Sequence, residues 1–107
     1  MTLFIDADSC PVRIREIICK TAQRLQVQAI FVANRLIPIP KNSYCTTIVT
    51  EAEEQAADIY ILDHATQGDM VITRDIPLAK QLVDAHIKVI NDRGVMYTAN
   101  NIGERLS

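Results

Sequence analysis

The feature that most constrains the fold is the alternation of short apolar runs with longer segments of helical periodicity. The runs are rich in β-branched residues and show little polar–apolar alternation, as expected of strands buried on both faces. The predicted strands cover residues 2–6, 27–34, 46–50, 69–73 and 87–90, and the predicted helices cover residues 11–25, 51–67 and 75–86. This order is typical of a parallel sheet between helices. We therefore expect a three-layer α/β/α sandwich with a mainly parallel sheet.

The predicted helix over residues 11–25 is amphipathic. Pro11 suits its first turn, where the missing N–H is not needed. Its apolar residues recur at helical spacing and should face the core: Ile14, Ile17, Ile18, Ala22 and Leu25.

At 107 residues the chain has the length of a single domain, residues 1–107. Near its end, Asn101 is followed three positions later by Glu104, a pattern similar to a capping box. Fewer than two helical turns follow, which is too short for a stable isolated helix. We therefore expect residues 102–107 to be poorly ordered or packed against another chain.

Charge and cysteine content limit the functional classes. The net charge is −2, which provides no electrostatic footprint for strong non-specific nucleic-acid binding. The three cysteines show no metal-ligand spacing, which favours a reducing compartment. With no signal peptide and no apolar run long enough to span a bilayer, the expected location is the cytoplasm.

Carboxylates occur where two of the predicted strands end. In "FIDADSCPV" a strand leads into Asp6 and Asp8, and in "VITRDIPLA" another strand leads to Asp75. Parallel strands end at the same edge of the sheet, which is where open α/β sheets bind ligands. Asp8 and Asp75 precede Pro-containing helix starts, so either can instead be a helix N-cap. Asp6 comes too early to cap a helix, and its burial requires a metal ion or strong hydrogen-bond donors.

Oxygen ligands without paired histidine or cysteine suit Mg²⁺ or Mn²⁺ better than Zn²⁺. His64 and His86 have no partner at metal-ligand spacing and are expected on the surface. Cys10 lies near a helix start, but no base accompanies it, so we expect a buried structural thiol. Asp58, taken alone, is expected to be a solvated helix residue.

Several segments resemble the YaiI/YqxD family of bacterial proteins, which is similar to the PIN-like nuclease domains. The segments that carry the resemblance are "FIDADSCPV", "VAN", "AAD", "GDMVITRDIPLAKQL" and "RGVMYTANNI", in the same order along nearly the whole chain. The resemblance implies a PIN-like fold. It also implies that the chain lacks a C-terminal helical part usual in the family.

The resemblance further implies a site. Asp6, Asp58 and Asp75 match the acidic residues with which PIN-like domains bind Mg²⁺ or Mn²⁺, with Asp8 and Thr73 in support. PIN enzymes usually carry a further glutamate on a central helix. The candidates for this residue are Glu51, Glu53 and Glu54, and none has a diagnostic context.

The leading functional hypothesis is a metal-dependent phosphodiesterase that acts on single-stranded RNA or another nucleic acid. Among its substrate-binding candidates, Arg35, Lys41 and Arg74 are expected to flank the same edge of the sheet and steer the backbone, with Tyr44 stacking on a base. Two alternatives stay open. One is a haloacid-dehalogenase-like phosphatase with Asp6 as nucleophile and Asp8 as general acid. The other is a catalytically silent module that binds nucleic acid or protein. The sequence indicates no membrane partner and leaves the oligomeric state open.

Overall fold

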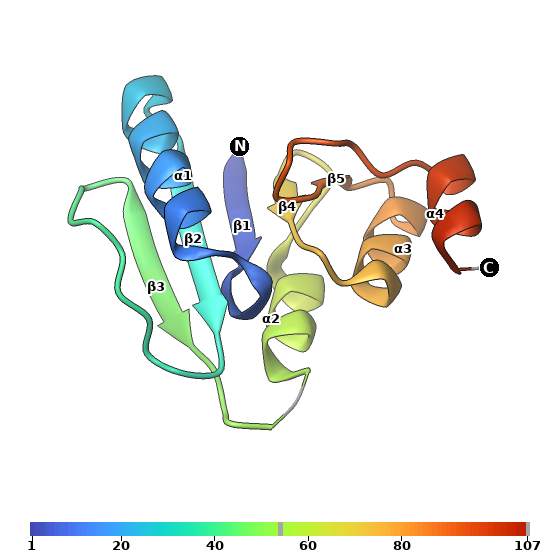
Figure 1. Cartoon of the computed structure of the whole chain (residues 1–107), viewed down its shortest axis with the longest axis horizontal. Coiled ribbons are helices and arrows are strands. Elements are labelled where there is room, and N and C mark those ends of the chain that lie inside the picture. The colour runs from blue at the N-terminus through green and yellow to red at the C-terminus, as the bar shows by residue number, and fades with distance from the viewer. Residues whose placement is uncertain (54, 107) are drawn as a thin grey trace.

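Five parallel strands form one sheet in the order β3-β2-β1-β4-β5, from left to right in Figure 1. The computed structural model describes residues 1–53 and 55–106. The strands are β1 (Thr2–Asp6), β2 (Gln28–Ala33), β3 (Cys45–Val49), β4 (Met70–Ile72) and β5 (Lys88–Ile90). The helices are α1 (Val12–Leu25), α2 (Ala56–His64), α3 (Ile76–Asp84) and α4 (Ala99–Leu106), with a short 3₁₀ turn, η1 (Ala7–Ser9). The prediction of a parallel sheet flanked by helices is confirmed.

The winding of the sheet reverses beside β1. The chain proceeds from β1 to β2 and β3 in one direction, and then returns to place β4 on the other side of β1. Asp6, the last residue of β1, is in register with Val32 of β2. In open parallel sheets, the crevice at such a reversal is the usual ligand site. The order of the strands therefore directs attention to the carboxyl ends of β1 and β4.

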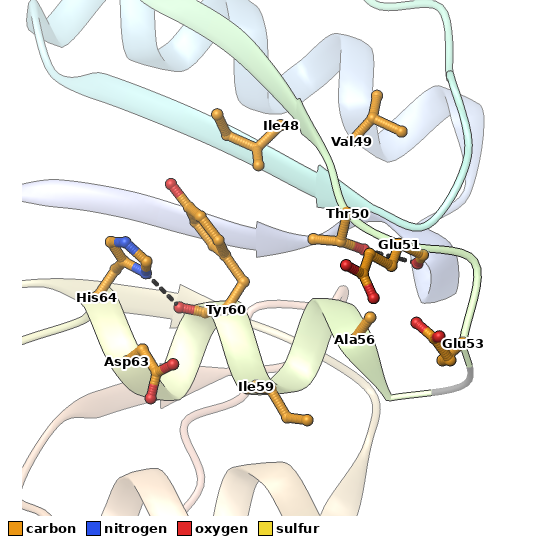
Figure 2. A pocket seen from close by; sticks show the side chains of 10 residues that line it. All are labelled: Ile48, Val49, Thr50, Glu51, Glu53, Ala56, Ile59, Tyr60, Asp63 and His64. Carbon is orange, nitrogen blue, oxygen red and sulfur yellow. Dashed lines mark hydrogen bonds between the residues drawn. The ribbon is translucent and has the colours of Figure 1, made fainter.

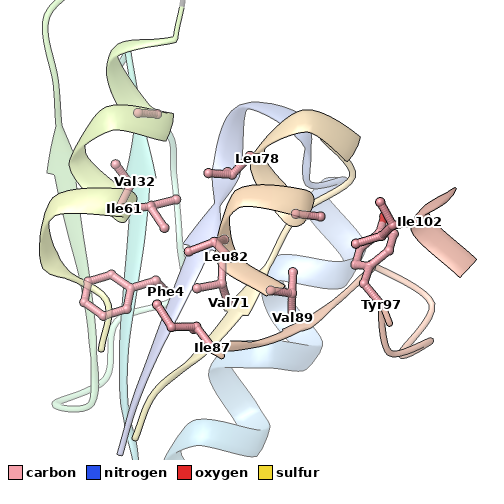
Figure 3. Close-up of a cluster of buried hydrophobic side chains, with 12 residues drawn as sticks. Phe4, Val32, Ile61, Val71, Leu78, Leu82, Ile87, Val89, Tyr97 and Ile102 are labelled. Atoms are coloured by element: carbon pink, nitrogen blue, oxygen red, sulfur yellow. The ribbon is translucent and has the colours of Figure 1, made fainter. Parts of the chain in front are cut away.

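Each face of the sheet has its own hydrophobic core, because successive strand residues point to opposite faces. Phe4 of β1 belongs to the cluster beneath α2, α3 and α4 shown in Figure 3, and neighbouring Ile5 belongs to the cluster beneath α1. Asp6 follows the same alternation and therefore lies on the side of α2 and α3.

The segment between β3 and β4 contains a shorter helix than expected. The sequence predicts a helix over residues 51–67, whereas α2 covers Ala56–His64. Its start is preceded by Gln55 in the left-handed conformation, and Ala65 at its end is extended. The Asp69 carboxylate then accepts hydrogen bonds from the Thr66 N–H and hydroxyl. This turn, which contains Gly68, separates the helix from β4.

The end of the chain differs from the expectation of an unstable tail. Helix α4 forms over Ala99–Leu106, and its Ile102 is 3% exposed within the cluster of Figure 3. Its capping box is centred on Thr98: the Thr98 hydroxyl accepts from the Asn101 N–H, and the Asn101 side-chain oxygen accepts from the Thr98 N–H. The predicted cap at Asn101 was thus three residues late. Burial of Ile102 stabilises this short helix. Helix propensity alone does not predict this contribution.

Helix α1 covers its face of the sheet only in part. Ile18 and Ala22 are buried as expected, but Ile17 and Leu25 are 51% and 55% exposed. The connection from β2 to β3, residues 34–44, contains no helix. Ile17 and Leu25 line an apolar groove beside α1 whose other walls come from β1, β4 and β5, so the predicted apolar stripe is partly at the surface.

Within the described residues, no helix combines the length and the apolar character needed to cross a membrane. Cys10, Cys19 and Cys45 are free thiols and all are buried. Burial raises the pKa of the Cys10 thiol to about 11, so the expectation of a structural cysteine at this position is confirmed.

Replacing Ile102 with Ala should lower the free energy of unfolding by about 2–4 kcal/mol, because it leaves a cavity where α4 meets the core. Urea unfolding monitored by circular dichroism measures this loss. The matched control is Ile59→Ala, whose side chain is 58% exposed and should change stability by less than about 0.5 kcal/mol. Equal effects of the two substitutions would contradict the docking of α4.

Candidate functional site: an acidic cleft

A cleft of about 530 Å³ opens at the carboxyl ends of β1 and β4. Its lining combines residues from η1, α2 and the segments after β2 and β4: Asp6, Asp8, Ser9, Asn34, Gln55, Ala57, Asp58, Arg74 and Asp75. All four aspartates singled out in the sequence are among them. The fold therefore brings together residues from opposite halves of the chain.

Asp6 is held by hydroxyl groups. Its side chain is 5% exposed, and its Oδ2 accepts hydrogen bonds from the Thr73 hydroxyl at 2.7 Å and the Ser9 hydroxyl at 3.2 Å. Its Oδ1 has no hydrogen-bond partner among the described residues. Burial raises the pKa of Asp6, the two hydroxyls partly offset this effect, and the charges of Asp8 and Asp75 add to it. Asp6 thus has one anchored oxygen and one available for a ligand.

Thr73 connects the two halves of the site. Its hydroxyl donates to Asp6 and accepts a hydrogen bond from the Asp75 N–H at 3.0 Å. Its own carbonyl accepts from the Tyr97 hydroxyl at 3.3 Å. These contacts fix the chain after β4 relative to the end of β1.

Asp75 is the N-cap of α3: its Oδ1 accepts from the Leu78 N–H at 2.8 Å, which confirms the capping hypothesis for this residue. The same hypothesis is wrong for Asp8. That residue lies in η1, and α1 begins after Pro11 without a side-chain cap. The exposed Asp8 instead accepts from the Asn34 N–H at 3.0 Å, because the turn after β1 brings it to the end of β2.

Asp58 is in the cleft rather than on a solvated helix face. Its position in the first turn of α2 directs it to the ends of β1 and β4. Its pKa is raised to about 6, first by burial, then by the charges of Asp6 and Asp75 and a hydrogen bond shared with the Asp75 carboxyl. The Asp58 carboxyl therefore stays protonated to a higher pH than an ordinary aspartate.

Arg74 is the only cation that lines the cleft among the described residues. It is largely exposed, and its Nε lies 3.7 Å from a carboxylate oxygen of Asp92. An exposed pair at this distance contributes little to stability. Arg74 is therefore free to contact a ligand at the mouth of the cleft.

The cleft offers the donor chemistry of a hydrated Mg²⁺ or Mn²⁺ ion. Within the described part of the chain, no three His, Cys, Asp or Glu side chains are already arranged as a metal site. Mg²⁺, however, usually keeps several waters and takes only one or two carboxylates. The free oxygen of Asp6 with one carboxyl of the Asp58 and Asp75 pair meets that requirement, and a bound cation would relieve the repulsion among these groups.

Three substrate-binding candidates lie outside the cleft. Arg35 follows β2 but is not among the lining residues. Lys41 and Tyr44 precede β3, and the Tyr44 carbonyl accepts from the N–H of Ala29 near the start of β2. The expectation that Lys41 flanks the same edge as Arg74 is wrong. A strand parallel to β2 must begin at the opposite edge of the sheet, so residues 34–44 run back along its length.

Two of the three candidates for a central glutamate are not in the cleft either. Glu51 and Glu53 line a different groove, on the far side of α2. Glu54 lies outside the described residues. Among the residues described, the acidic groups of the cleft are thus all aspartates.

Sequence reasoning missed Ser9, Asn34 and Gln55. The Ser9 hydroxyl contacts Asp6 and accepts from the Arg74 N–H at 3.5 Å. Asn34 could have been predicted from the sequence, because it lies where a strand ends, as Asp6 does. Gln55 carried no signal, because its place depends on the left-handed turn before α2.

The fold and the cleft define a doubly wound α/β protein with an acidic site at the point where the winding reverses. A sequence model described as "Uncharacterized BCR, YaiI/YqxD family" matches residues 4–107. The chain belongs to this family. It is 55% identical over its whole length to a UPF0178 protein of Treponema denticola and 54% identical to one of Treponema pallidum. A UPF0178 protein of Syntrophobacter fumaroxidans is 48% identical.

The chain spans 68%, 60% and 70%, respectively, of the lengths of these three relatives. No solved structure gives a significant match to the chain.

Replacing Thr73 with Val should destabilise the protein by about 2 kcal/mol at neutral pH, because the buried Asp6 carboxylate loses a hydrogen-bond donor without a change of side-chain volume. Ser9→Ala should cost less, about 1 kcal/mol, since the single proton of that hydroxyl is shared between the carboxylate and main-chain oxygens of Asp6. Urea unfolding measures both losses. A loss at Ser9 larger than that at Thr73 would contradict the assignment of Thr73 as the main donor.

Asp58 should make the metal-free protein less stable as the pH rises from about 4 to about 6. Its pKa is about 6 in the folded chain against a reference value of 3.8, so stabilisation by its proton is complete below pH 4 and is lost as the pH passes 6. The stability gain from Asp58→Asn should therefore grow with pH. The growth should be about 1–2 kcal/mol, below the roughly 3 kcal/mol of the full shift, because solvent screens the group.

Urea unfolding in the presence of a chelator, repeated from about pH 4 to pH 7, tests this dependence. Asp63→Asn, on the exposed side of the same helix, is the matched control. If Asp58→Asn changed stability by the same amount at every pH, the raised pKa would be refuted.

Proposed function

We propose that this chain is a metal-dependent phosphodiesterase of the PIN-like kind, acting on single-stranded RNA or another nucleic acid. The observation that carries the proposal is the gathering of four aspartates around one cleft at the reversal point of the sheet. A structural role accounts for Asp75 as a helix cap. A hydrogen bond from the Asn34 N–H likewise engages Asp8, but neither role accounts for Asp6 and Asp58 in the same cleft.

The residues that would hold a Mg²⁺ or Mn²⁺ ion are Asp6, Asp58 and Asp75. Such an ion, when bound, activates water and stabilises charge on phosphoryl oxygens. Thr73 keeps Asp6 Oδ2 engaged and leaves Oδ1 available. Since the ligands must be deprotonated, binding should strengthen as the pH rises through the pKa of Asp58, about 6.

The roles of the remaining cleft residues follow from their charge and exposure. Arg74 would contact a phosphate of the substrate, because it is the exposed cation at the mouth of the cleft. Asp8 would support the site from the rim of the cleft, where its carboxylate accepts a hydrogen bond from the Asn34 N–H. Substrate binding by Arg35, Lys41 and Tyr44 stays a prediction, and for the last two it would require contact at the opposite edge of the sheet.

The second candidate is a silent binding module with the same cleft. It is favoured by one observation: within the described residues, no glutamate lines the cleft, whereas PIN enzymes usually have one. Both candidate functions predict metal binding, but only the phosphodiesterase predicts catalytic turnover.

Asp6→Asn should abolish cleavage of end-labelled single-stranded RNA in Mn²⁺, with a loss of about 100-fold or more in rate. It should also weaken Mn²⁺ binding, measured separately by electron paramagnetic resonance. Asp58→Asn and Asp75→Asn should act in the same direction. Single-stranded DNA of the same sequence, assayed in parallel, identifies the preferred sugar.

Asp63→Asn is the control and should leave cleavage and Mn²⁺ binding unchanged, because its side chain lies outside the cleft. Mn²⁺ binding by the parent chain without cleavage of RNA or DNA would overturn the phosphodiesterase and leave the binding module. A phosphorylated Asp6 trapped from a phosphate donor would instead support the phosphatase alternative.

A further inference from the structure

A second groove, of about 590 Å³, lies between β3 and the outer side of α2 (Figure 2). Helix α2 contacts β2 and β1, so this face of the edge strand β3 is left without a covering helix. Figure 2 shows the rings of Tyr60 and His64 rising from α2 toward Ile48 of β3. The two rings are stacked, with centroids 3.9 Å apart. The floor of the groove is thus apolar and partly aromatic.

Carboxylates stand at both ends of this groove. Glu51 and Glu53 lie where the chain leaves β3, and Asp63 lies near the end of α2 (Figure 2). All three are exposed, and none makes an ion pair among the described residues. Val49 and Ile59, at its two rims, are 51% and 58% exposed, and their side chains point away from the floor formed by Ile48 and Tyr60 (Figure 2). The groove therefore suits an apolar helix face that carries cations.

The outer side of α1 has that character. Positions 13, 17, 20 and 24 are spaced so that they share one helix face, and they hold Arg13, Ile17, Lys20 and Arg24. All four side chains are exposed. The three cations also make no ion pair among the described residues. One chain thus presents a cationic, partly apolar helix and an anionic, apolar groove on different surfaces.

We propose that α1 of one copy of this chain docks in the groove between β3 and α2 of a second copy. The lengths agree: Arg13 and Arg24 lie about 17 Å apart along α1, and the acidic ends of the groove are separated by α2, about 14 Å long. Docking pairs unpartnered charges of opposite sign and removes Ile17 and the apolar floor at Ile48 and Tyr60 from water. This association is independent of the proposed chemistry in the cleft.

The two surfaces are different, so the contact is head-to-tail, and the copies form either an open chain with one free groove and one free α1 or a closed ring. The mass of the assembly should therefore rise with protein concentration. It should fall at high salt, because exposed ion pairs are screened. Sedimentation velocity measures both dependences.

Two charge-reversal variants test the pairing directly. Glu53→Lys with Asp63→Lys alters only the groove, and Lys20→Glu with Arg24→Glu alters only α1. Each variant alone should be monomeric, because one of its two surfaces is repulsive. An equimolar mixture should associate again, since the intact α1 of the first fits the intact groove of the second and the two reversed surfaces are also of opposite charge.

Lys41→Glu with Lys88→Glu is the control for the α1 variant, because it makes the same change of net charge outside both surfaces and should associate like the parent chain. A parent chain that stays monomeric at high concentration, or a mixture that forms no dimer, would overturn the proposal. A different result would assign the basic face of α1 to nucleic acid instead. In that result the parent chain is monomeric and binds single-stranded RNA, and the α1 variant no longer binds it.

Discussion

The site depends on the hydrogen bond from the Thr73 hydroxyl to Asp6 Oδ2, 2.7 Å long and buried. It joins the end of β1 to the residue that follows β4 and satisfies one oxygen of a carboxylate that would otherwise be costly to bury. The same hydroxyl accepts from the Asp75 N–H, and thereby orients the start of α3. This one interaction therefore helps to position the side chains of Asp6 and Asp75. It also affects Asp58, which contacts the Asp75 carboxyl.

Most of the architecture follows from the sequence because burial on both faces leaves a simple signature. The apolar runs at β1, β2 and β4 contain few polar positions, and each is followed by a residue that ends the strand. Asp6 and Asp75 were predictable from the same rule, since parallel strands end at one edge. The resemblance to a known family added Asp58, which its helical context alone had assigned to solvent.

Other features depend on tertiary contacts that no local pattern encodes. Helix α4 is too short to be stable by propensity, and it forms because Ile102 enters the core. The Ser9 hydroxyl donates to Asp6 because the turn of η1 brings the two residues together. Lys41 was assigned to the wrong edge because a loop without a helix gave no indication that it spans the full length of the sheet.

The interleaved strand order also determines when the cleft can exist during folding. The contact of Asp8 with Asn34 joins residues 26 apart, whereas that of Thr73 with Asp6 joins residues 67 apart. Closing the longer loop costs more chain entropy, and non-local pairing slows folding. A growing chain can pair β1 with β2 early, but the Thr73 hydroxyl can donate to Asp6 only after β4 has joined the sheet. Until then, the central strand of the sheet has a free edge that is open to intermolecular pairing.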